Sequence, residues 1–393
     1  MIKRKFSLLI VAAIVLSIPI TIFLVEHQQN TKSSAAAPDK LEAEDGVLSG
    51  NVAILSDSLA SGGRYIALGI NPTPTPIAQP GTVYNVPSTI DKTGSTVVSS
   101  QINSWISSLP NGTASNPTIA EFAPGTYKLG PSGAINIDNK SFIYLSGYGV
   151  TIRATGGSGI DDSAIKIGSN TPSHDIKAYG FNIIGANPDG ATERAYHRGA
   201  ESQQGFQLSS NIGNYNVEIY DNTISDVYGH AIYIRSNNAP FPNNINFHNN
   251  IIRRTGVMGV AIVNGTNITI KSNLVEDTPL YPINIEDGIA DQPAQHIYIL
   301  DNTINRWGWD PTYTAHAISA EESTGLIWDD VVVDGNKLQG GDAGTTNTTN
   351  STSGPISFWG GDLKKNLKIT NNVSSVPVDG WASRFNNVSG LIV

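Results

Sequence analysis

The chain has 393 residues, 39% hydrophobic and 15% charged, so it is long enough to bury a large core. Its formal net charge is −9, and no basic patch is evident in the sequence, which makes nucleic acid an unexpected partner. There is no cysteine, so stability must come from packing rather than from disulfides. The 39 glycines and the frequent asparagines favour turn-rich β structure over helical bundles.

Residues 1–30 are expected to form a transmembrane or signal helix. Three basic residues, Lys3, Arg4 and Lys5, precede the uncharged segment 6–25. A helix of that length reaches roughly 30 Å, the thickness of the bilayer core. Two interpretations stay open, namely an uncleaved membrane anchor and a cleaved signal peptide. Both predict that the rest of the chain is extracytoplasmic, with membrane contact only if the helix is retained.

Residues 31–86 are expected to hold a polar spacer, a short β segment and a linker. The segment 41–69, with "EAEDG", "LSG" and "ASGGRY", resembles the opening of β-sandwich carbohydrate-binding modules. That resemblance implies that Glu42 and Glu44 help to hold a structural calcium. The family's module is several times longer, whereas this segment runs into "NPTPTPIAQPG", an extended Pro/Thr linker. The alternative is a simple hairpin.

Residues 87–393 are predicted to form one all-β domain that opens with a helix. Val98, Ile102, Ile106 and Leu109 have helical spacing, and "PTIAEFAPGTYKLG" then predicts a strand, a Pro-Gly turn and a second strand. This opening resembles the entry of right-handed parallel β-helix proteins of the pectate-lyase superfamily. The resemblance implies that the helix caps the first coil and covers its open strand edges.

The rest of the chain repeats one pattern, seen in "VEIYDNTI", "INFHNNII", "ITIKSNLV", "IYILDNTI", "VVVDGNKL" and "LKITNNVS". A second short strand follows or precedes each unit, for example "GFQLS", "AIYIR" and "INIED". Two or three short strands per turn are typical of a stacked β-solenoid. The shared asparagine is predicted to bond backbone groups at a bend and to stack on its copies. These asparagines are Asn222, Asn250, Asn273, Asn302, Asn336 and Asn372.

Aligning the second strands predicts which residues become neighbours about 4.8 Å apart. The inward columns are Phe206, Ile232, Ala261, Ile283, Ile318, Ile356 and Leu208, Ile234, Val263, Ile285, Ala320, Phe358. The outward columns are Gln207, Tyr233, Ile262, Asn284, Ser319, Ser357 and Ser209, Arg235, Asn264, Glu286, Glu321, Trp359. Glu286 would lie beside Glu321, and Asp287 beside Glu322. Because like charges repel, such a cluster favours a bound cation or a shared proton, and solvated acids are the alternative.

Long loops are predicted at both edges of this sheet, where they would wall off a groove suited to a polymer. Tyr233, Asn264 and Asn284 would line that groove. Trp307 and Trp309 lie in one loop and would either stack on sugar rings or pack on the solenoid. Glu201 and Gln203, in the first long loop, are further candidates for binding the substrate, and His230 and His316 each precede a strand.

The segments "IIGANPDG", "VEIYDNTISDVYGHAIYI" and "INIED" look like exported bacterial right-handed β-helix proteins over residues 87 to about 340. A lyase interpretation follows from the resemblance: calcium bound by Glu286, Asp287, Glu321 and Glu322, with Arg235 acting on a uronate sugar. In a hydrolase interpretation Glu286 and Glu321 flank a glycosidic bond. His230 and His316 would tune either site. Arg235 pairing with Asp226 or Glu201, and a noncatalytic glycan-binding adhesin, are the alternatives.

Overall fold

The computed structural model divides the chain into two units, residues 1–73 and residues 74–393. The structure describes residues 52–56, 64–68, 79–131, 133–156, 163–187, 203–286, 292–308, 316–322, 327–339, 355–360, 364–374 and 388–389. The predicted helix 1–30, the acids Glu42 and Glu44 and most of the linker lie outside these ranges. Within them, no helix is both long enough and apolar enough to cross a membrane.

In the first unit the described residues form one antiparallel strand pair. Strand β1 (Val52–Ser56) pairs with β2 (Arg64–Leu68), with Ile54 opposite Ile66. The β-branched and aromatic residues Val52, Ile54, Tyr65 and Ile66 favour the extended conformation of both strands. This agrees with the hairpin alternative for this segment.

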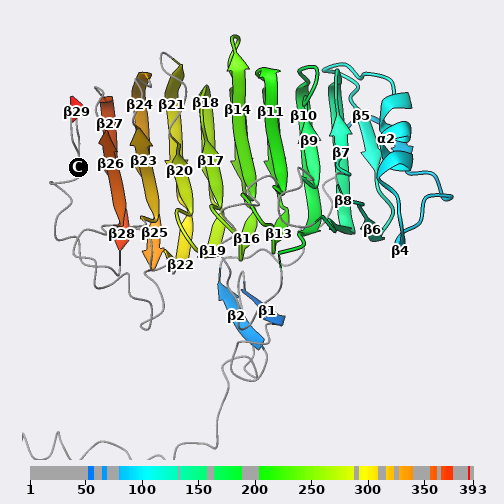
Figure 1. Ribbon diagram of the computed structural model, residues 1–393, viewed down its shortest axis with the longest axis horizontal. Helices are drawn as coiled ribbons and strands as arrows, with labels where there is room; N and C mark the ends of the chain where they lie inside the picture. The colour runs from blue at the N-terminus through cyan, green and yellow to red at the C-terminus, as the bar shows by residue number, and fades with distance from the viewer. Residues whose placement is uncertain are drawn as a thin grey trace, which may run out of the picture. The chain divides into compact units, whose positions relative to one another are not determined.

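The second unit is a stack of coils, in which each strand pairs in parallel with its counterpart one coil later (Figure 1). The first sheet contains β3 (Thr82–Asn85), β5 (Thr118–Glu121), the first parts of β8 (Ser141–Arg153) and β10 (His174–Ile184), then β12 (Tyr215–Tyr220), β15 (Asn243–His248), β18 (Gly265–Lys271), β21 (Pro293–Leu300), β24 (Ile327–Asp334), β27 (Lys364–Thr370) and β29 (Val388–Ser389). The second sheet contains β4 (Thr93–Val97), β6 (Gly125–Lys128), the last parts of β8 and β10, then β13 (Thr223–Ser225), β16 (Ile251–Arg253), β19 (Leu274–Thr278), β22 (Thr303–Trp307), β25 (Lys337–Gln339) and β28 (Val373–Ser374). The third sheet contains β7 (Ile135–Ile137), β9 (Ile165–Ile167), β11 (Phe206–Ile212), β14 (Ile232–Asn238), β17 (Val260–Ile262), β20 (Ile283–Ile285), β23 (Ile318–Glu322) and β26 (Ile356–Gly360). The predicted parallel solenoid is confirmed.

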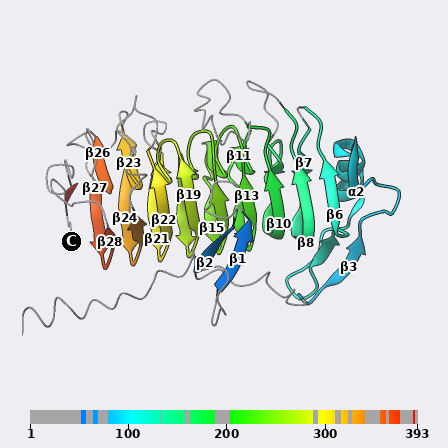
Figure 2. The same cartoon turned by 90° about the horizontal axis from the view of Figure 1, so that it is seen from below.

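Helix α2 (Ser99–Ser108) lies at the N-terminal end of the coils and packs against β7, as predicted (Figure 2). It buries Ile102, Trp105 and Ile106. The ring of Trp105 meets Phe122 edge-on, with 5.2 Å between centroids, and Phe122 meets Phe181 in the same way at 5.4 Å. The helix therefore closes the apolar end of the core. Because β3 pairs with β5 from Thr82 onward, the β-helix begins before residue 87, the expected boundary.

Alternating apolar residues from all three sheets face inward and form one continuous core. In the third sheet, one rung differs from the predicted register. Val260 pairs with Ile232, so Val260 and Ile262 take the inward positions that the prediction gave to Ala261 and Val263. Residues 260–263 are all apolar, so alternation alone does not decide which two of them face the core. The pairings of the other rungs agree with the predicted columns.

The coils turn at residues in the left-handed backbone conformation, which asparagine and aspartate adopt more readily than most other residues. One column opens the first sheet: Phe142, Asp175, Asn216, Asn244, Asn267, His296, Asp330 and Asn366. A second separates the first and second sheets: Asp221, Asn249, Ser272, Asp301, Gly335 and Asn371. A third follows the second sheet: Asp226, Arg254, Asp277 and Arg306. The recurring Asn and Asp residues are thus explained largely by corners.

At the third corner, opposite charges alternate from coil to coil. Arg254 binds both carboxylate oxygens of Asp226, at 2.7 Å from Nε and 2.9 Å from Nη2. Arg306 binds Asp277 in the same way, at 2.8 and 2.7 Å. Two parallel bonds fix the geometry of each pair. Asp226 therefore pairs with Arg254 and not, as one alternative held, with Arg235.

The second corner carries the predicted asparagine ladder. Each ladder Oδ1 accepts a hydrogen bond from the backbone N–H of the ladder residue one coil earlier, for example Asn250 N to Asn273 Oδ1 at 2.9 Å. Each Nδ2 also donates to a backbone carbonyl, as from Asn273 to Phe247 at 3.0 Å. The ladder runs without interruption from Asn222 to Asn372. Its predicted structural role is confirmed.

We expect Asn273→Ala to lower the free energy of unfolding by about 2–4 kcal/mol, because it leaves buried backbone groups of two neighbouring coils without partners. The measurement is urea unfolding followed by circular dichroism. The control is Asn243→Ala, which removes an exposed asparagine of the first sheet. Equal losses in both variants would contradict a structural role specific to the ladder.

Candidate functional site

The predicted acid cluster lies at the end of β20 and β23. The strands pair through Ile285 and Ala320, and Glu286 and Glu321 directly follow these paired residues. The backbone N–H of Glu286 donates to the carbonyl of Ile262 at 2.8 Å, and the residue is half-buried. Asp287 and the side chains of Glu321 and Glu322 lie outside the described residues. The strand pairing thus agrees with Glu286 and Glu321 being neighbours along the sheet, and it gives no position for the carboxylates of Glu321 and Glu322.

Two of the predicted groove residues are buried. Asn284 is only 3% exposed; its Oδ1 accepts from the Ser319 hydroxyl at 2.6 Å, and its Nδ2 faces the sulfur of Met258 at 3.7 Å. Asn264 is fully buried, and its Oδ1 accepts from the backbone N–H of Ser236 at 2.9 Å. Asn264 therefore acts as a corner pin, like the ladder residues. The sequence prediction placed Asn264 on the outer face because its register at residues 260–263 was wrong by one residue.

The two predicted histidines are also buried, and each stacks on a tyrosine. His230 lies parallel to Tyr233 with 5.4 Å between ring centroids, and His316 lies parallel to Tyr281 at 6.2 Å. Burial lowers the pKa of His230 to about 4, so this imidazole is neutral near pH 7. Tyr233 remains half-buried at the outer surface of β14.

The remaining predicted residues occupy mixed environments. Trp307 is 7% exposed, in line with its packing alternative. Gln203 is buried and its Oε1 accepts from the backbone N–H of Ala186 at 2.9 Å, which makes it a structural pin. Arg235 is half-buried, and its Nε finds no hydrogen-bond partner among the described residues. Trp309 and Glu201 lie outside the described part of the chain.

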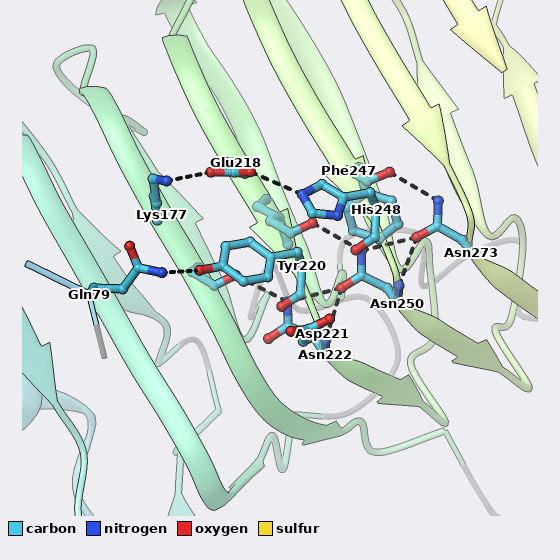
Figure 3. A network of polar contacts seen from close by, with 12 residues as sticks. Gln79, Lys177, Glu218, Tyr220, Asp221, Asn222, Phe247, His248, Asn250 and Asn273 are labelled. Carbon is cyan, nitrogen blue, oxygen red and sulfur yellow. Dashed lines mark hydrogen bonds and ion pairs between the residues drawn. The ribbon is translucent and has the colours of Figure 1, made fainter. Parts of the chain in front are cut away.

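A different group of chemically active side chains lies on the outer face of the first sheet (Figure 3). Lys177 Nζ lies 2.8 Å from Glu218 Oε2, and His248 Nε2 lies 3.0 Å from Glu218 Oε1. The three residues come from β10, β12 and β15, so one hydrogen-bonded row crosses three coils. The hydrogen bond from His248, followed by that from Lys177, lowers the pKa of Glu218 to about 2. Glu218 is therefore an ionised carboxylate near neutral pH.

Beside this row, aromatic rings stack along the helix axis. Tyr220 stacks on His248 at 5.1 Å between centroids and on Tyr179 at 5.0 Å. The Tyr220 hydroxyl accepts a hydrogen bond from Gln79 Nε2 at 3.4 Å (Figure 3). Burial, and then the neighbouring Tyr179 and Glu218, raise the pKa of Tyr220 well above its ordinary value. This phenol keeps its proton next to a carboxylate that has lost its own.

An open pocket of about 370 Å³ lies over the same coils. Lys177 and Glu218 line it, together with Tyr144, Asp175 and the amides of Asn216, Asn244 and Asn246. The ammonium of Lys177 lies 5.2 Å from the centroid of the Tyr144 ring. Side-chain amides, a charged row and an aromatic ring together form a polar surface that can hydrogen-bond several hydroxyl groups at once.

This pocket was not predicted, although its signal is present in the sequence. In "HDIKAYG", "VEIYDN" and "INFHNN" the outward positions hold Lys177 with Tyr179, Glu218 with Tyr220, and Asn246 with His248. Neither outward column keeps one residue type through all three coils, since only Tyr179 and Tyr220 match, so the columns carry no repeated motif.

Three or more potential metal ligands of the His, Asp or Glu type do not come together anywhere in the described residues. Three of the four predicted calcium ligands, Asp287, Glu321 and Glu322, have no described side chain. The predicted calcium therefore stays a proposal, for which carboxylate oxygens are the appropriate ligands.

Solved structures with related folds have low sequence identity to this chain. ORF18 of Geobacillus virus E2 gives a TM-score of 0.49 at 15% identity, covering 79% of this chain and 59% of that one. The catalytic unit of a GH87 α-1,3-glucanase from Streptomyces thermodiastaticus gives 0.46 at 15%, covering 75% and 55%. The A-module of the mannuronan C-5 epimerase AlgE6 from Azotobacter vinelandii gives 0.41 at 13%, covering 79% and 98%. The chain thus spans less than two thirds of the first two structures.

Among curated proteins, none matches the sequence significantly. A family model described as "Right handed beta helix region" matches residues 103–275, from helix α2 to strand β19. This is the region in which the strands stack in parallel, coil upon coil. Together, the match and the stacked coils show that the second unit has the right-handed parallel β-helix fold.

Proposed function

We propose that the chain binds a polysaccharide on the outer face of the first sheet, over β8, β10, β12 and β15. The observation that carries this proposal is the 370 Å³ pocket with its amide side chains and its row of Lys177, Glu218 and His248. Among the described residues, the side chain of Asn246 makes no hydrogen bond, so its amide is available to a ligand. Sugar hydroxyls both donate and accept hydrogen bonds, and the amide and charged side chains of this surface can do the same.

The geometry also suits a chain-like ligand. Outward positions recur about every 4.8 Å along the sheet, which is the spacing between neighbouring strands and is comparable with the length of one sugar unit. The faces of the Tyr179, Tyr220 and His248 rings contact one another, and Tyr179 is buried, so these faces are not available to a sugar ring. The sugar is therefore held mainly by hydrogen bonds and not by stacking on these three rings.

We expect Asn246→Ala to weaken polysaccharide binding about tenfold, which is the effect of losing one or two ligand hydrogen bonds. Affinity electrophoresis against a panel of soluble polysaccharides measures the loss. The control is Lys368→Ala, in the same outward column four coils further along. Binding that falls equally in the control would place the ligand elsewhere.

Cleavage of the bound polysaccharide is a second candidate function. It is favoured by an ionised carboxylate and a protonated phenol that lie close together on one strand. Glu218 is ionised and Tyr220 is protonated, and the two lie on the same side of one strand, about 7 Å apart along it. Near neutral pH an ionised carboxylate can accept a proton and a protonated phenol can donate one. The lowered pKa makes Glu218 a weaker base and the raised pKa makes Tyr220 a weaker acid, so the scheme rests on the position of the two groups and not on their pKa shifts. Glu218 is the acceptor in this scheme, and Tyr220 is the donor to the leaving oxygen.

If the chain cleaves its ligand, Tyr220→Phe should lower turnover by about 10² to 10⁴, because the phenol supplies the proton. Binding should change little, since the ring and its stacking are retained. Reducing ends and the absorbance of unsaturated products measure hydrolysis and elimination separately. Full turnover in Tyr220→Phe would remove this mechanism. If the natural chain shows no turnover on any polysaccharide, it is a noncatalytic glycan-binding protein.

The acid cluster of Glu286, Asp287, Glu321 and Glu322 is a separate proposal for a catalytic or calcium site on the third sheet. The adjacent pairing of Ile285 and Ala320 supports it. We expect the double variant Glu286→Gln and Glu321→Gln to abolish either turnover or calcium-linked stabilisation, without unfolding the chain. Thermal melts with calcium or chelator, alongside the turnover assay, give the result. Loss of turnover in this variant but not in Tyr220→Phe would assign the reaction to the third sheet.

We also propose an extracytoplasmic location. The uncharged segment 6–25 behind three basic residues supports export through either an anchor or a signal peptide. A polysaccharide ligand agrees with such a location.

A further inference from the structure

The pocket on the first sheet has an unbalanced charge. Its charged lining residues are Asp175, Lys177 and Glu218, which amount to two carboxylates against one ammonium. Two histidines lie at its margin, with His174 bonded to Asp175 at 2.6 Å and His248 bonded to Glu218 at 3.0 Å. The remaining polar lining consists of neutral amides. The lining itself therefore presents an excess of one negative charge to any ligand.

The one ammonium in the lining is already engaged. Lys177 Nζ lies 2.8 Å from Glu218 and over the face of the Tyr144 ring. The carboxylate of Glu218 is held from its other side by His248, so the ion pair is fixed on both sides (Figure 3). A ligand carboxylate that bound another N–H of Lys177 would lie next to the carboxylate of Glu218 itself.

Neutral sugars have no such conflict. Their hydroxyls can donate to Asp175 and Glu218 and accept from the amides of Asn244 and Asn246. Specificity of this kind arises from repulsion of the wrong ligand as much as from attraction of the right one. Because the pocket is open to solvent, dissolved salt screens this repulsion.

We infer that this pocket selects glycans without carboxylates, and that Glu218 is the residue that excludes uronic acids. The inference rests on the proposed polysaccharide binding and adds the ligand class to it. It differs from the uronate ligand that the lyase interpretation of the sequence had implied. Glu218 acts here as a specificity residue, through its charge and through its hold on Lys177.

Calorimetry with defined hexasaccharides tests the inference on the full-length chain. The neutral probes are cellohexaose, mannohexaose and maltohexaose, and the acidic probes are hexagalacturonate and hexaguluronate. We expect at least one neutral probe to bind tenfold or more tightly than both acidic probes. For the acidic probes, affinity should rise between 50 and about 500 mM salt, because salt screens a repulsion.

The variant Glu218→Gln makes the decisive comparison. It keeps the shape of the side chain but removes its charge and releases Lys177, so affinity for an acidic probe should rise tenfold or more. The matched control is Asp334→Asn, which removes an acid from the same sheet outside the pocket. That control should leave the preference unchanged.

Each failure has its own signature. Tight binding of an acidic probe to the natural chain, lost in Asn246→Ala, would overturn the inference and leave the proposed binding site standing. An acidic probe that stays excluded in Glu218→Gln would overturn the role of Glu218. If no probe binds at all, the proposed function fails, and the inference fails with it.

Discussion

The structure depends on the pairing of each strand with the same strand one coil later. That register decides which side chains face the core and which become neighbours outside it. Backbone pairing alone allows a strand to slip, so the corners must hold it. Residues in the left-handed backbone conformation set the turn at each corner. At the second corner, the ladder from Asn222 to Asn372 joins successive coils by hydrogen bonds. Each ladder side chain makes hydrogen bonds to the coils on both sides. A slip in the register of one coil would therefore break its bonds to both neighbouring coils.

Repetition made the fold predictable from the sequence. The ladder asparagine recurs with the same residue type in six coils, and the alternating apolar residues around it identify the strands. The capping helix was predictable for the same reason, since Ile102 and Ile106 have helical spacing. The prediction failed only where the pattern was ambiguous. At residues 260–263 four apolar residues follow one another, and the inward pair could be chosen only from the pairing with Ile232 and Ile234.

The site was less predictable, because its residues obey no repeat. Lys177, Glu218 and His248 each come from a different coil, and they differ in type and charge. Their relationship exists only after the coils are stacked. Acid pairs such as Glu286 with Asp287 attract attention because they are adjacent in sequence. A row that crosses three coils has no such local signal, and the burial of Asn284, His230 and His316 on the third sheet could not be inferred from alternation.

The alternating charges at the third corner restrict how such a solenoid can change in length. Asp226, Arg254, Asp277 and Arg306 occupy equivalent places in four successive coils, with an acid and a base in turn. Duplicating the coding sequence of one of these coils would place two aspartates or two arginines side by side. Like charges on neighbouring strands repel and destabilise a sheet. Copying two coils together would keep the order of signs. In this part of the molecule, growth by duplication is therefore favoured in steps of two coils.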